Sequence, residues 1–516
     1  MIKSLLLICA ISSIVLSGTF YVDPAVGKAT NDGSQSSPWK SLQQVVADNL
    51  FETTEFTSYP FTAAAGFKPR NAGAPIQPGD TILLLSGYHG DVTIRRAYNN
   101  DYITIKAAEN HSPSLRSLKL SAVRKWIISG LTISPEQTPQ YDQVRLIHIE
   151  SHGYSGPASD VIIQNCSLYS VRNTSSWSMQ DWNDKACNGI NLNGTRCIAR
   201  NNTLLNVNFG ISSSGDSNLV EYNTITNFAG DGLRGLGDDN TFRYNTVKNC
   251  YDVNGNHDDG FQSWSSGPGG VGTGTVFRMQ LIGNTIINYE DPNQPFRGTL
   301  QGIGCFDGMF EDWQVMNNVV IVDHWHGITL SGARNCSIIN NTVIDANDDK
   351  PGPSWIRIGN HKNGTASTGC VVVNNLGTSF SIDSASCAAY SHNIDVTNRN
   401  DFFVDFASFN MRLKPEAAAV NSGNNDFAPD LDIARNARPV EGIADIGAHE
   451  YRTAAPAQNA VMHSVRPRTN NYALHLFNAP ISSPAALLLI NGRMAPQGSR
   501  VTTQSGLRPV VVRTGE

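Results

Sequence analysis

One short motif recurs along most of the chain: an Asn followed by Thr and an aliphatic residue, or a close variant of these. It occurs at eight positions: Asn165, Asn202, Asn223, Asn245, Asn284, Asn318, Asn341 and Asn375. Consecutive positions are 37, 21, 22, 39, 34, 23 and 34 residues apart, which indicates a period near 22 with insertions in some repeats. A unit this short cannot bury its apolar face alone, so it must stack on its neighbours.

The period is typical of one coil of a parallel β-helix. The stretches between the motifs contain short apolar runs without helical periodicity, as expected for strands of three to five residues. A β-propeller blade needs about twice this length, and a leucine-rich repeat needs Leu at fixed places. Stacked Asn amides that bond from coil to coil at a tight bend would explain why Asn recurs. We therefore predict an all-β solenoid of the parallel β-helix type.

The rest of the chain divides into terminal segments. Residues 1–18 carry a Lys before an apolar run and predict a secretory signal peptide, hence an exported protein. Residues 19–125 are expected to form an N-terminal cap with the first coils, including a short helix that starts at the pair Ser41 and Gln44. The main coils are predicted over 126–395, C-terminal coils and a cap over 396–451, and a linker with a small β-module over 452–516.

The charge and the apolar runs of the sequence limit the partners that the protein can have. The net charge of −6 and the pI near 6.1 leave no basic footprint, so we expect no nucleic-acid partner. No later stretch reaches the roughly 18 apolar residues of a membrane span, and we expect a soluble monomer.

Cys336 and Cys370 occupy equivalent places in adjacent coils, about 4.8 Å apart. They form either a disulfide or two buried, stacked thiols.

A second strand in each repeat has a Gly followed by alternating apolar residues. Alternation turns the apolar residue after the Gly inward and the next residue outward, and we take the residue before the Gly to face outward too. The outward pairs are, coil by coil, Asn188/Asn191, Phe209/Ser212, Asp231/Arg234, Asp259/Gln262, Gln301/Gly304, His326/Thr329 and Ser354/Arg357. An earlier strand adds Arg145, His148 and Glu150.

This column brings chemically active side chains together. Asp231 and Asp259 lie one coil step apart, and His326 lies two steps beyond Asp259, near 10 Å away by the strand spacing. An Asp before Gly is by itself a common turn residue. Two of them in adjacent coils, beside Arg234 and His257, point to a site. Long insertions at 250–258 and 287–300 would raise loops beside it, and a groove there would have three aromatic walls: Trp264, Phe306 and Trp325.

These motifs resemble the right-handed parallel β-helices of the pectate-lyase-like superfamily, over roughly residues 78–450. The segment from Asp231 to Phe261 is similar to the calcium-binding coils of the family-nine pectate lyases. The resemblance implies a Ca²⁺ ion held by three carboxylates: Asp231, Asp258 and Asp259. Those lyases use a Lys base shortly after the Asp-Gly strand, where this chain has Gln262 and no Lys. Three residues could replace it: Arg234, Arg297 and His326.

The resemblance implies an exported enzyme that acts on an acidic polysaccharide. The first hypothesis is calcium-assisted β-elimination of a uronate, which needs a cation on the carboxylate and a base near C5. The catalytic candidates are Arg234, His257, Asp259 and His326, and the substrate-binding candidates are Gln262, Trp264, Gln301 and Arg357. Hydrolysis by the Asp231/Asp259 pair is the second hypothesis. C5-epimerisation with Tyr251, His257 and Asp259, and a carbohydrate-binding or adhesion β-helix without turnover, also stay open.

Overall fold

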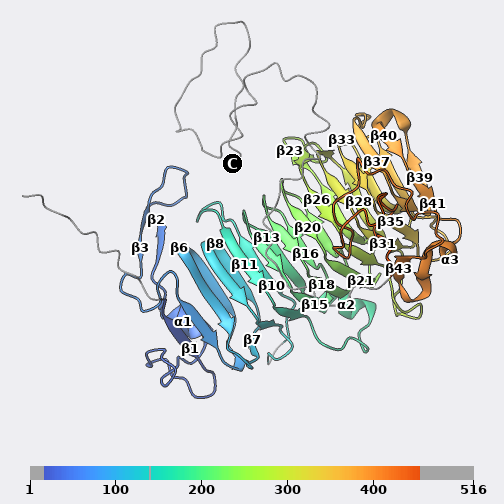
Figure 1. Ribbon diagram of the computed structural model, residues 1–516. Coiled ribbons are helices and arrows are strands. Elements are labelled where there is room, and N and C mark those ends of the chain that lie inside the picture. The colour runs from blue at the N-terminus through green and yellow to red at the C-terminus, as the bar shows by residue number, and fades with distance from the viewer. Residues whose placement is uncertain (1–16, 139–140, 454–516) are drawn as a thin grey trace, which may run out of the picture. The chain divides into compact units, whose positions relative to one another are not determined.

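The computed structural model describes residues 17–138 and 141–453. The predicted signal peptide and the predicted C-terminal linker and module lie outside these residues, apart from 17, 18, 452 and 453. Within the described part, short parallel strands stack coil upon coil into a right-handed parallel β-helix, which confirms the predicted fold (Figure 1). None of the helices in this part has the length and apolar composition that crossing a membrane requires.

Each main coil contributes strands to three parallel columns. The column that carries the predicted outward residues is called the site sheet below, and it contains β10 (Arg145–Glu150), β13 (Asn188–Asn193), β16 (Ile211–Ser213), β19 (Leu233–Gly235), β22 (Asp259–Trp264), β28 (Gln301–Asp307), β32 (His326–Ser331), β36 (Trp355–Gly359) and β39 (Ser379–Ile382). The second column contains β11 (Ser159–Gln164), β14 (Ile198–Arg200), β17 (Leu219–Glu221), β20 (Thr241–Arg243), β26 (Gln280–Ile282), β30 (Gln314–Met316), β34 (Ser337–Ile339), β37 (Cys370–Val373) and β40 (Cys387–Ser391).

The third column is a separate parallel sheet. Its strands are β5 (Gly87–Tyr88), β7 (Pro113–Leu115), β9 (Thr132–Ile133), β12 (Ser167–Tyr169), β15 (Thr203–Val207), β18 (Thr224–Phe228), β21 (Thr246–Cys250), β27 (Thr285–Ile287), β31 (Val319–Val322), β35 (Thr342–Asp345), β38 (Leu376–Gly377) and β41 (Ile394–Asp395). Two long strands, β6 (Val92–Ala107) and β8 (Leu118–Ser129), begin in the site sheet and end in the second column. β8 pairs first with β10 and then with β11, and β6 pairs with β8 in both parts.

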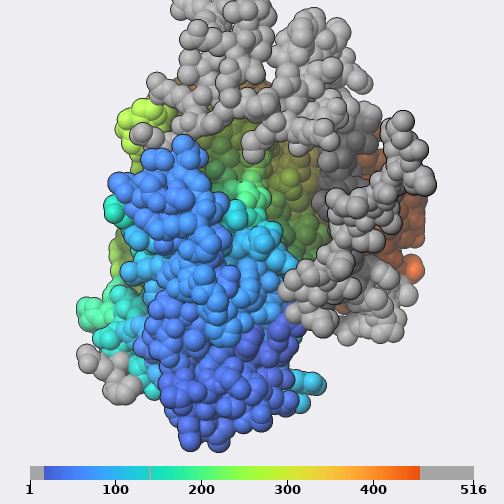
Figure 2. All heavy atoms as spheres, turned by 90° about the vertical axis from the view of Figure 1, so that its left-hand side faces the viewer, coloured from blue at the N-terminus to red at the C-terminus, as the bar shows by residue number. Residues whose placement is uncertain are grey.

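Smaller elements close the ends and decorate the coils. At the N-terminal end these are β1 (Thr19–Val22), α1 (Leu42–Ala47), the hairpin of β2 (Thr53–Phe56) and β3 (Phe67–Arg70), and β4 (Thr81–Leu84). Elements farther along are α2 (Met179–Lys185), β23 (Ser266–Gly267), β24 (Gly270–Val271), β25 (Thr275–Phe277), β29 (Met309–Glu311), β33 (Ala333–Arg334), α3 (Arg399–Phe402), β42 (Phe403–Asp405) and β43 (Asn410–Leu413). Figure 2 looks onto the N-terminal end, which these first elements cover.

The start of α1 follows from the sequence. Ser41 caps the helix by accepting a hydrogen bond from the backbone N–H of Gln44, at 3.2 Å. Leu42 and Val45 on its inner face are fully buried against the first coils. At the other end, the residues after β41 pack an apolar cluster that includes Phe403 and Met411 against the third column. Both ends of the core are thus shielded from water.

The recurring Asn residues form a hydrogen-bonded ladder, as the repeat predicted. The Asn245 side-chain oxygen accepts from the backbone N–H of Asn223 at 3.1 Å and from its amide at 3.0 Å. The Asn245 amide in turn donates to the Val220 carbonyl, at 2.9 Å, and to the next ladder residue, Asn284. Every ladder member except the last repeats this bond to the next coil: Asn202, Asn223, Asn245, Asn284, Asn318, Asn341, Asn375 and Asn393.

One predicted member was wrong and one was missed. Asn165 is exposed and outside the ladder, and Cys166 takes its place by donating its backbone N–H to the Asn202 side-chain oxygen at 3.0 Å. Asn165 instead has a left-handed φ of 55°, like the residue before each ladder Asn, for example Asn201 at 53°. Asn tolerates this conformation better than most residues, so the bend uses Asn for two different reasons. The missed member is Asn393, which bonds Asn375.

The Gly that starts each site-sheet motif is explained by close packing between coils. A Cβ on Gly210 would lie 2.3 Å from the carbonyl oxygen of Gly232 in the next coil, and one on Gly302 would lie 2.2 Å from that of Gly327. No side chain fits at these distances, so the position requires Gly. Cys336 and Cys370 do stack in adjacent coils, and the structure has both as buried free thiols rather than a disulfide.

The ladder is expected to carry much of the stability. Asn245→Ala removes the acceptor for the Asn223 backbone N–H and the donor for the Val220 carbonyl, both buried. We expect the free energy of unfolding to fall by roughly 2–4 kcal/mol, because each buried group left unpaired costs about 1–3 kcal/mol. Chemical denaturation followed by circular dichroism measures this loss. The control Asn165→Gly keeps the left-handed backbone and should leave the midpoint nearly unchanged; equal losses in both variants would refute the ladder's special role.

Candidate active site

The site sheet aligns the predicted outward column almost as expected. Its backbone register places the following residues opposite one another on consecutive strands: Asn191, Ser212, Arg234, Gln262, Gly304, Thr329 and Arg357. The exception is the coil of β36. A register irregularity between β32 and β36 sets Trp355, not Ser354, opposite His326. Ser354 is fully buried and its hydroxyl donates to the carbonyls of Val322 and His324.

A cleft of about 370 Å³ lies on this face of the site sheet. Its lining residues are His257, Gln262, Ser263, Trp264, Gln301, Phe306, Asp307, His324, Trp325, His326 and Lys362. The structure therefore brings together the predicted residues of β22, β28 and β32 and the three predicted aromatic walls. Two other cavities, of about 330 and 460 Å³, lie at the N-terminal end and contain none of these residues. The choice of this cleft rests on its chemistry, not on its size.

Asp231 is neutralised by an arginine of its own strand. Arg234 donates from Nε to Asp231 Oδ2 at 2.9 Å and also bonds this oxygen through Nη2. The guanidinium lies between two rings, 4.4 Å from the centroid of Phe209 and 4.8 Å from that of Trp264. The other oxygen of Asp231 accepts the backbone N–H of Asp259 at 3.2 Å. Asp231 is thus buried with both oxygens occupied, and removing Arg234 alone would leave an uncompensated buried charge.

Asp259 and His257 form a dyad at the edge of the cleft. The Asp259 side chain is fully buried while that of His257 is 70% exposed, and His257 Nδ1 lies 3.7 Å from Asp259 Oδ2. The same oxygen accepts from the Gln262 amide at 3.0 Å. Gly304 makes room for the carboxyl, because a Cβ there would lie 2.1 Å from Asp259 Oδ1. A buried carboxyl that orients an exposed imidazole is a common general acid–base arrangement.

The dyad retains a proton at neutral pH. Burial raises the pKa of Asp259 to about 8, and the nearby negative charge of Asp231 adds to this. The Asp259 carboxyl beside it raises the pKa of His257 above its usual 6.5, against a smaller effect of burial. The two groups share protons, so the pKa values belong to the pair. With a pKa of about 8, the Asp259 carboxyl supplies a proton on this side of the cleft at neutral pH.

The imidazole of His326 has a lowered pKa, in contrast to that of His257. Burial, with the charges of His324 and Arg357, lowers the pKa of His326 to about 4. His326 Nδ1 lies 3.0 Å from the Thr329 hydroxyl, and the Trp355 indole N–H is 3.1 Å from that hydroxyl and 3.3 Å from the imidazole nitrogen. The ring also contacts Phe306 at a centroid distance of 4.6 Å. His326 is therefore neutral at pH 7 and able to accept a proton.

The three predicted calcium ligands do not converge. Asp258 is buried on the other side of the strand start, where the Cys250 thiol bonds its Oδ2 at 3.4 Å and burial raises its pKa to about 8. Asp231 already has Arg234 as its cation. Within residues 17–138 and 141–453, no three His, Cys, Asp or Glu side chains come together as a metal-ligand set. The donor set in this arrangement does not fit Ca²⁺, which takes six to eight oxygen ligands.

The remaining predicted residues have mixed positions. Gln301 lines the cleft, and within the described structure its buried Oε1 has no hydrogen-bond partner. Arg357 is not among the residues that line the cleft; it bonds the Ser381 hydroxyl at 2.7 Å and lies over the Trp355 ring. Sequence reasoning missed His324, although the alternation His-Trp-His before Gly327 could have indicated it. It also missed Lys362, which comes from the turn after β36 and has no pattern in the sequence.

No protein-family model and no curated protein sequence matches this chain. Several solved structures resemble it. Pectate lyase Pel9A is 14% identical over 84% of this chain and 96% of its own, with a TM-score of 0.45. A rhamnogalacturonan lyase is 12% identical over 79% and 97%, with a TM-score of 0.35. The GH136 lacto-N-biosidase from Eubacterium ramulus is 11% identical over 72% and 67%, with a TM-score of 0.36. Sequence identities this low bear on the fold alone and not on the function.

The dyad can be tested in the free protein. In Asp259→Asn the carboxylate charge beside His257 is lost, so the pKa of His257 should fall toward its ordinary value of 6.5 or below it. Titration of the histidine side chains by NMR measures the shift, with His257→Ala used to assign the signal. The matched control is Asp307→Asn, which removes a carboxyl from the same cleft that bonds Lys362 instead. An unchanged His257 pKa in Asp259→Asn would show that the two side chains do not interact.

Proposed function

We propose that the protein is an exported enzyme that cleaves a uronate-containing polysaccharide by β-elimination, with His326 as the base and the His257–Asp259 dyad as the acid. One observation carries the proposal: two imidazoles line the same cleft, and the pKa of one, His257, is raised while the pKa of the other, His326, is lowered to about 4. Paired titratable groups with pKa values driven apart by their environments mark the acid and the base of a reaction.

In the proposed reaction, His326 accepts one proton and the dyad donates one. His326 Nε2 takes the proton from C5 of the uronate, and the electron pair of that bond forms the C4=C5 double bond. The C4–O bond breaks, and the dyad gives its proton to the departing glycosidic oxygen. The products are a chain with an unsaturated uronate at its new non-reducing end and a chain with a new reducing end. Two positioned proton-transfer groups of this kind contribute about 10²–10⁴-fold each.

His326 can act as the base in the tautomer with its proton on Nδ1, in which the indole N–H of Trp355 donates to the Thr329 hydroxyl and not to Nδ1. With the proton on Nδ1, the ring donates to the Thr329 hydroxyl, and the Trp355 indole donates to the same oxygen at the shorter of its two distances. This tautomer leaves Nε2 free to accept. Burial and the charge of His324 hold the pKa low, so His326 is not consumed by protonation at neutral pH. The low pKa makes it a modest base, and the substrate carbon must therefore be acidified by a cation.

The cleft supplies cationic and aromatic groups for an acidic sugar. Lys362 lines it with a side chain that is 63% exposed, and Arg234 lies against the Trp264 ring of its wall. Both can be shared with a uronate carboxylate, which acidifies C5–H without a metal step. Trp264, Phe306 and Trp325 offer ring faces for stacking on sugars. The unpaired Gln301 Oε1 is an acceptor for a sugar hydroxyl, since a buried acceptor without a partner is costly.

The other hypotheses fit this geometry less well. Hydrolysis needs either a carboxylate separation of about 6.5–9.5 Å or a nucleophile about 5–5.5 Å from the acid. Asp231 lies one strand step from Asp259, and its oxygens are taken by Arg234 and a backbone N–H, so it cannot attack. Epimerisation through Tyr251 is disfavoured because that ring stacks on Trp182, away from the cleft residues. A binder without turnover would not need groups with divergent pKa values.

The first test follows unsaturated-uronate absorbance and new reducing ends together, over a panel of acidic and neutral polysaccharides. We expect both signals on an acidic polymer, and a loss of at least about 10²-fold in His326→Ala and in His257→Ala. His111→Ala, in an exposed turn of the N-terminal coils, is the control. Since the carboxylates form no ligand set, EDTA should leave the rate unchanged. Reducing ends without absorbance would replace elimination by hydrolysis, and no product on any polymer would leave binding as the function.

The pH dependence of kcat/KM tests the assignment of roles. Elimination needs neutral His326, so the rate should rise with pH through about 4, and it needs the protonated dyad, so it should fall above about 8. In Asp259→Asn, residual activity should have its alkaline limb moved down toward 6.5, because His257 loses the carboxylate that holds its proton. An alkaline limb that stays in place in this variant would mean that another group is the acid.

A further inference from the structure

A second cleft, called the N-terminal cleft here, lies at the far end of the site sheet. It has a volume of about 460 Å³, and its lining includes Arg70, Arg95, Arg96, Lys119, Glu150 and Tyr154. Arg95 and Lys119 are on β6 and β8, and Arg70 ends the hairpin β2–β3, which pairs with β6 and rises beside the sheet. The cleft therefore has the site sheet as its floor and a hairpin as one wall.

The cleft has an excess of positive charge in a protein whose net charge is −6. Its two carboxylates have their own lysines: Glu150 pairs with Lys119 at 2.9 Å, and Glu55 with Lys68 at 3.2 Å. Within the described residues, no carboxylate lies at ion-pair distance from the three arginines of the cleft: Arg70, Arg95 and Arg96. Three guanidinium groups without a counter-charge in one concave surface create a local attraction for an anion.

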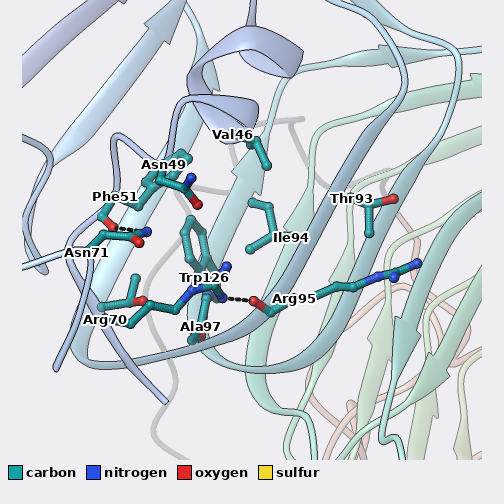
Figure 3. A pocket seen from close by; sticks show the side chains of 11 residues that line it. Val46, Asn49, Phe51, Arg70, Asn71, Thr93, Ile94, Arg95, Ala97 and Trp126 are labelled. Atoms are coloured by element: carbon teal, nitrogen blue, oxygen red, sulfur yellow. Dashed lines mark hydrogen bonds between the residues drawn. The ribbon is translucent and has the colours of Figure 1, made fainter. Parts of the chain in front are cut away.

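Two of these arginines are held in place by neutral groups. Arg70 Nη1 donates to the carbonyls of Arg95 and Arg96, the latter at 2.9 Å. Arg96 donates from Nε to the Ser155 hydroxyl at 3.2 Å, and its guanidinium lies 4.1 Å from the centroid of the Tyr59 ring. Arg95 is exposed, and in Figure 3 its side chain extends away from the buried Trp126 ring. Fixed arginines lose little entropy when an anion binds.

An aromatic ring accompanies the charges. The Tyr154 ring is half exposed, stacks on Tyr59 at a centroid distance of 5.9 Å, and lies 5.6 Å from the Arg96 guanidinium. Arginine beside an exposed, rigidly held aromatic ring can bind the carboxylate and the apolar face of one sugar acid together. A small inorganic anion would make no use of the ring.

One row of outward residues on the site sheet leads from the N-terminal cleft toward the active-site cleft. The backbone register leads from Lys119 through His148, Asn191 and Ser212 to Arg234, so these residues form one outward row. Six strand steps separate β6 from β22, or about 29 Å at the strand spacing. Between Lys119 and Arg234 this row consists of His148, which bonds the Asn191 side chain at 3.1 Å, and the two short side chains of Asn191 and Ser212, over which an extended polymer can pass.

We propose that the N-terminal cleft is a non-catalytic binding site for the acidic polysaccharide, and that it holds one part of a chain whose other part lies in the active-site cleft. The identity of the polymer rests on the proposed function. A nucleic acid would also be attracted by three arginines. The N-terminal cleft shares a row of outward residues with the active-site cleft, whose aromatic rings suit sugars, and this favours the polysaccharide.

The test uses the full chain with His257→Ala, so that the polymer is consumed at least about 10²-fold more slowly. Binding of polygalacturonate and of alginate is compared with binding of their trisaccharides and of neutral dextran, at low ionic strength, by isothermal titration. Arg95→Glu reverses one exposed charge without disturbing the Arg70 and Arg96 contacts. We expect the ratio of polymer affinity to trisaccharide affinity to fall about tenfold. Arg412→Glu, an exposed arginine of the C-terminal cap with a neutral partner, is the matched control and should leave this ratio unchanged.

Three results would overturn the proposal. An unchanged ratio in Arg95→Glu would show that the cleft binds no polymer, and an equal fall in Arg412→Glu would show only general charge attraction. Loss of binding to a single-stranded DNA oligomer, with polysaccharide binding intact, would assign the cleft to nucleic acid. If the protein binds the polymer through Arg95 but produces no unsaturated uronate, the binding-site proposal stands and the proposed reaction is wrong. The two proposals therefore fail separately.

Discussion

The hydrogen bond between the side chain of one ladder Asn and the backbone of the coil before it is the constraint on which the rest of this structure depends. A parallel coil must turn sharply where a left-handed residue precedes the ladder position, and the polar groups exposed at that bend are buried by the next coil. An amide side chain satisfies them at the strand spacing, step after step, from Asn202 to Asn393. Every residue of the site sheet is held in register by these bends. Two side chains that are dozens of residues apart in the chain are thereby neighbours on one face.

The chemistry of the cleft follows from this stacking. Asp231 and Asp259 come from adjacent coils, and two buried carboxyls cannot both be ionised at low cost. The fold resolves the conflict by giving Asp231 a guanidinium and Asp259 a shared proton with His257. Two coils farther, His326 is surrounded by aromatic rings and loses its proton readily. The aromatic wall that we propose for stacking on a sugar thus also sets the protonation state of the proposed base.

Much of the fold and part of the site could be predicted because both depend on periodicity. Alternation gave the register of the row from Asn191 to Arg357, and the insertions at 250–258 and 287–300 indicated a groove with three aromatic walls. The errors have local causes. Asn165 was assigned to the ladder because a left-handed Asn and a ladder Asn look alike in a sequence. Trp355 was missed because a one-residue irregularity in register leaves no trace in the repeat. Lys362 arrives from a turn, where no periodicity constrains the side chain.

The sequence by itself determined the solenoid, its coil length and which side chains face outward, because a 22-residue period and strict alternation permit one arrangement. Only the tertiary structure decided which of those side chains act together. Asp258 and Asp259 are adjacent in the chain, yet one accepts from the Cys250 thiol and the other lies 3.7 Å from His257, since consecutive residues at a strand start point to opposite sides. The calcium ligand set expected from similarity would need both carboxyls on one side, whereas the dyad seen in the structure contains Asp259 alone. Charge pairing and burial, which depend on neighbours in other coils, then set the protonation states that the proposed reaction uses.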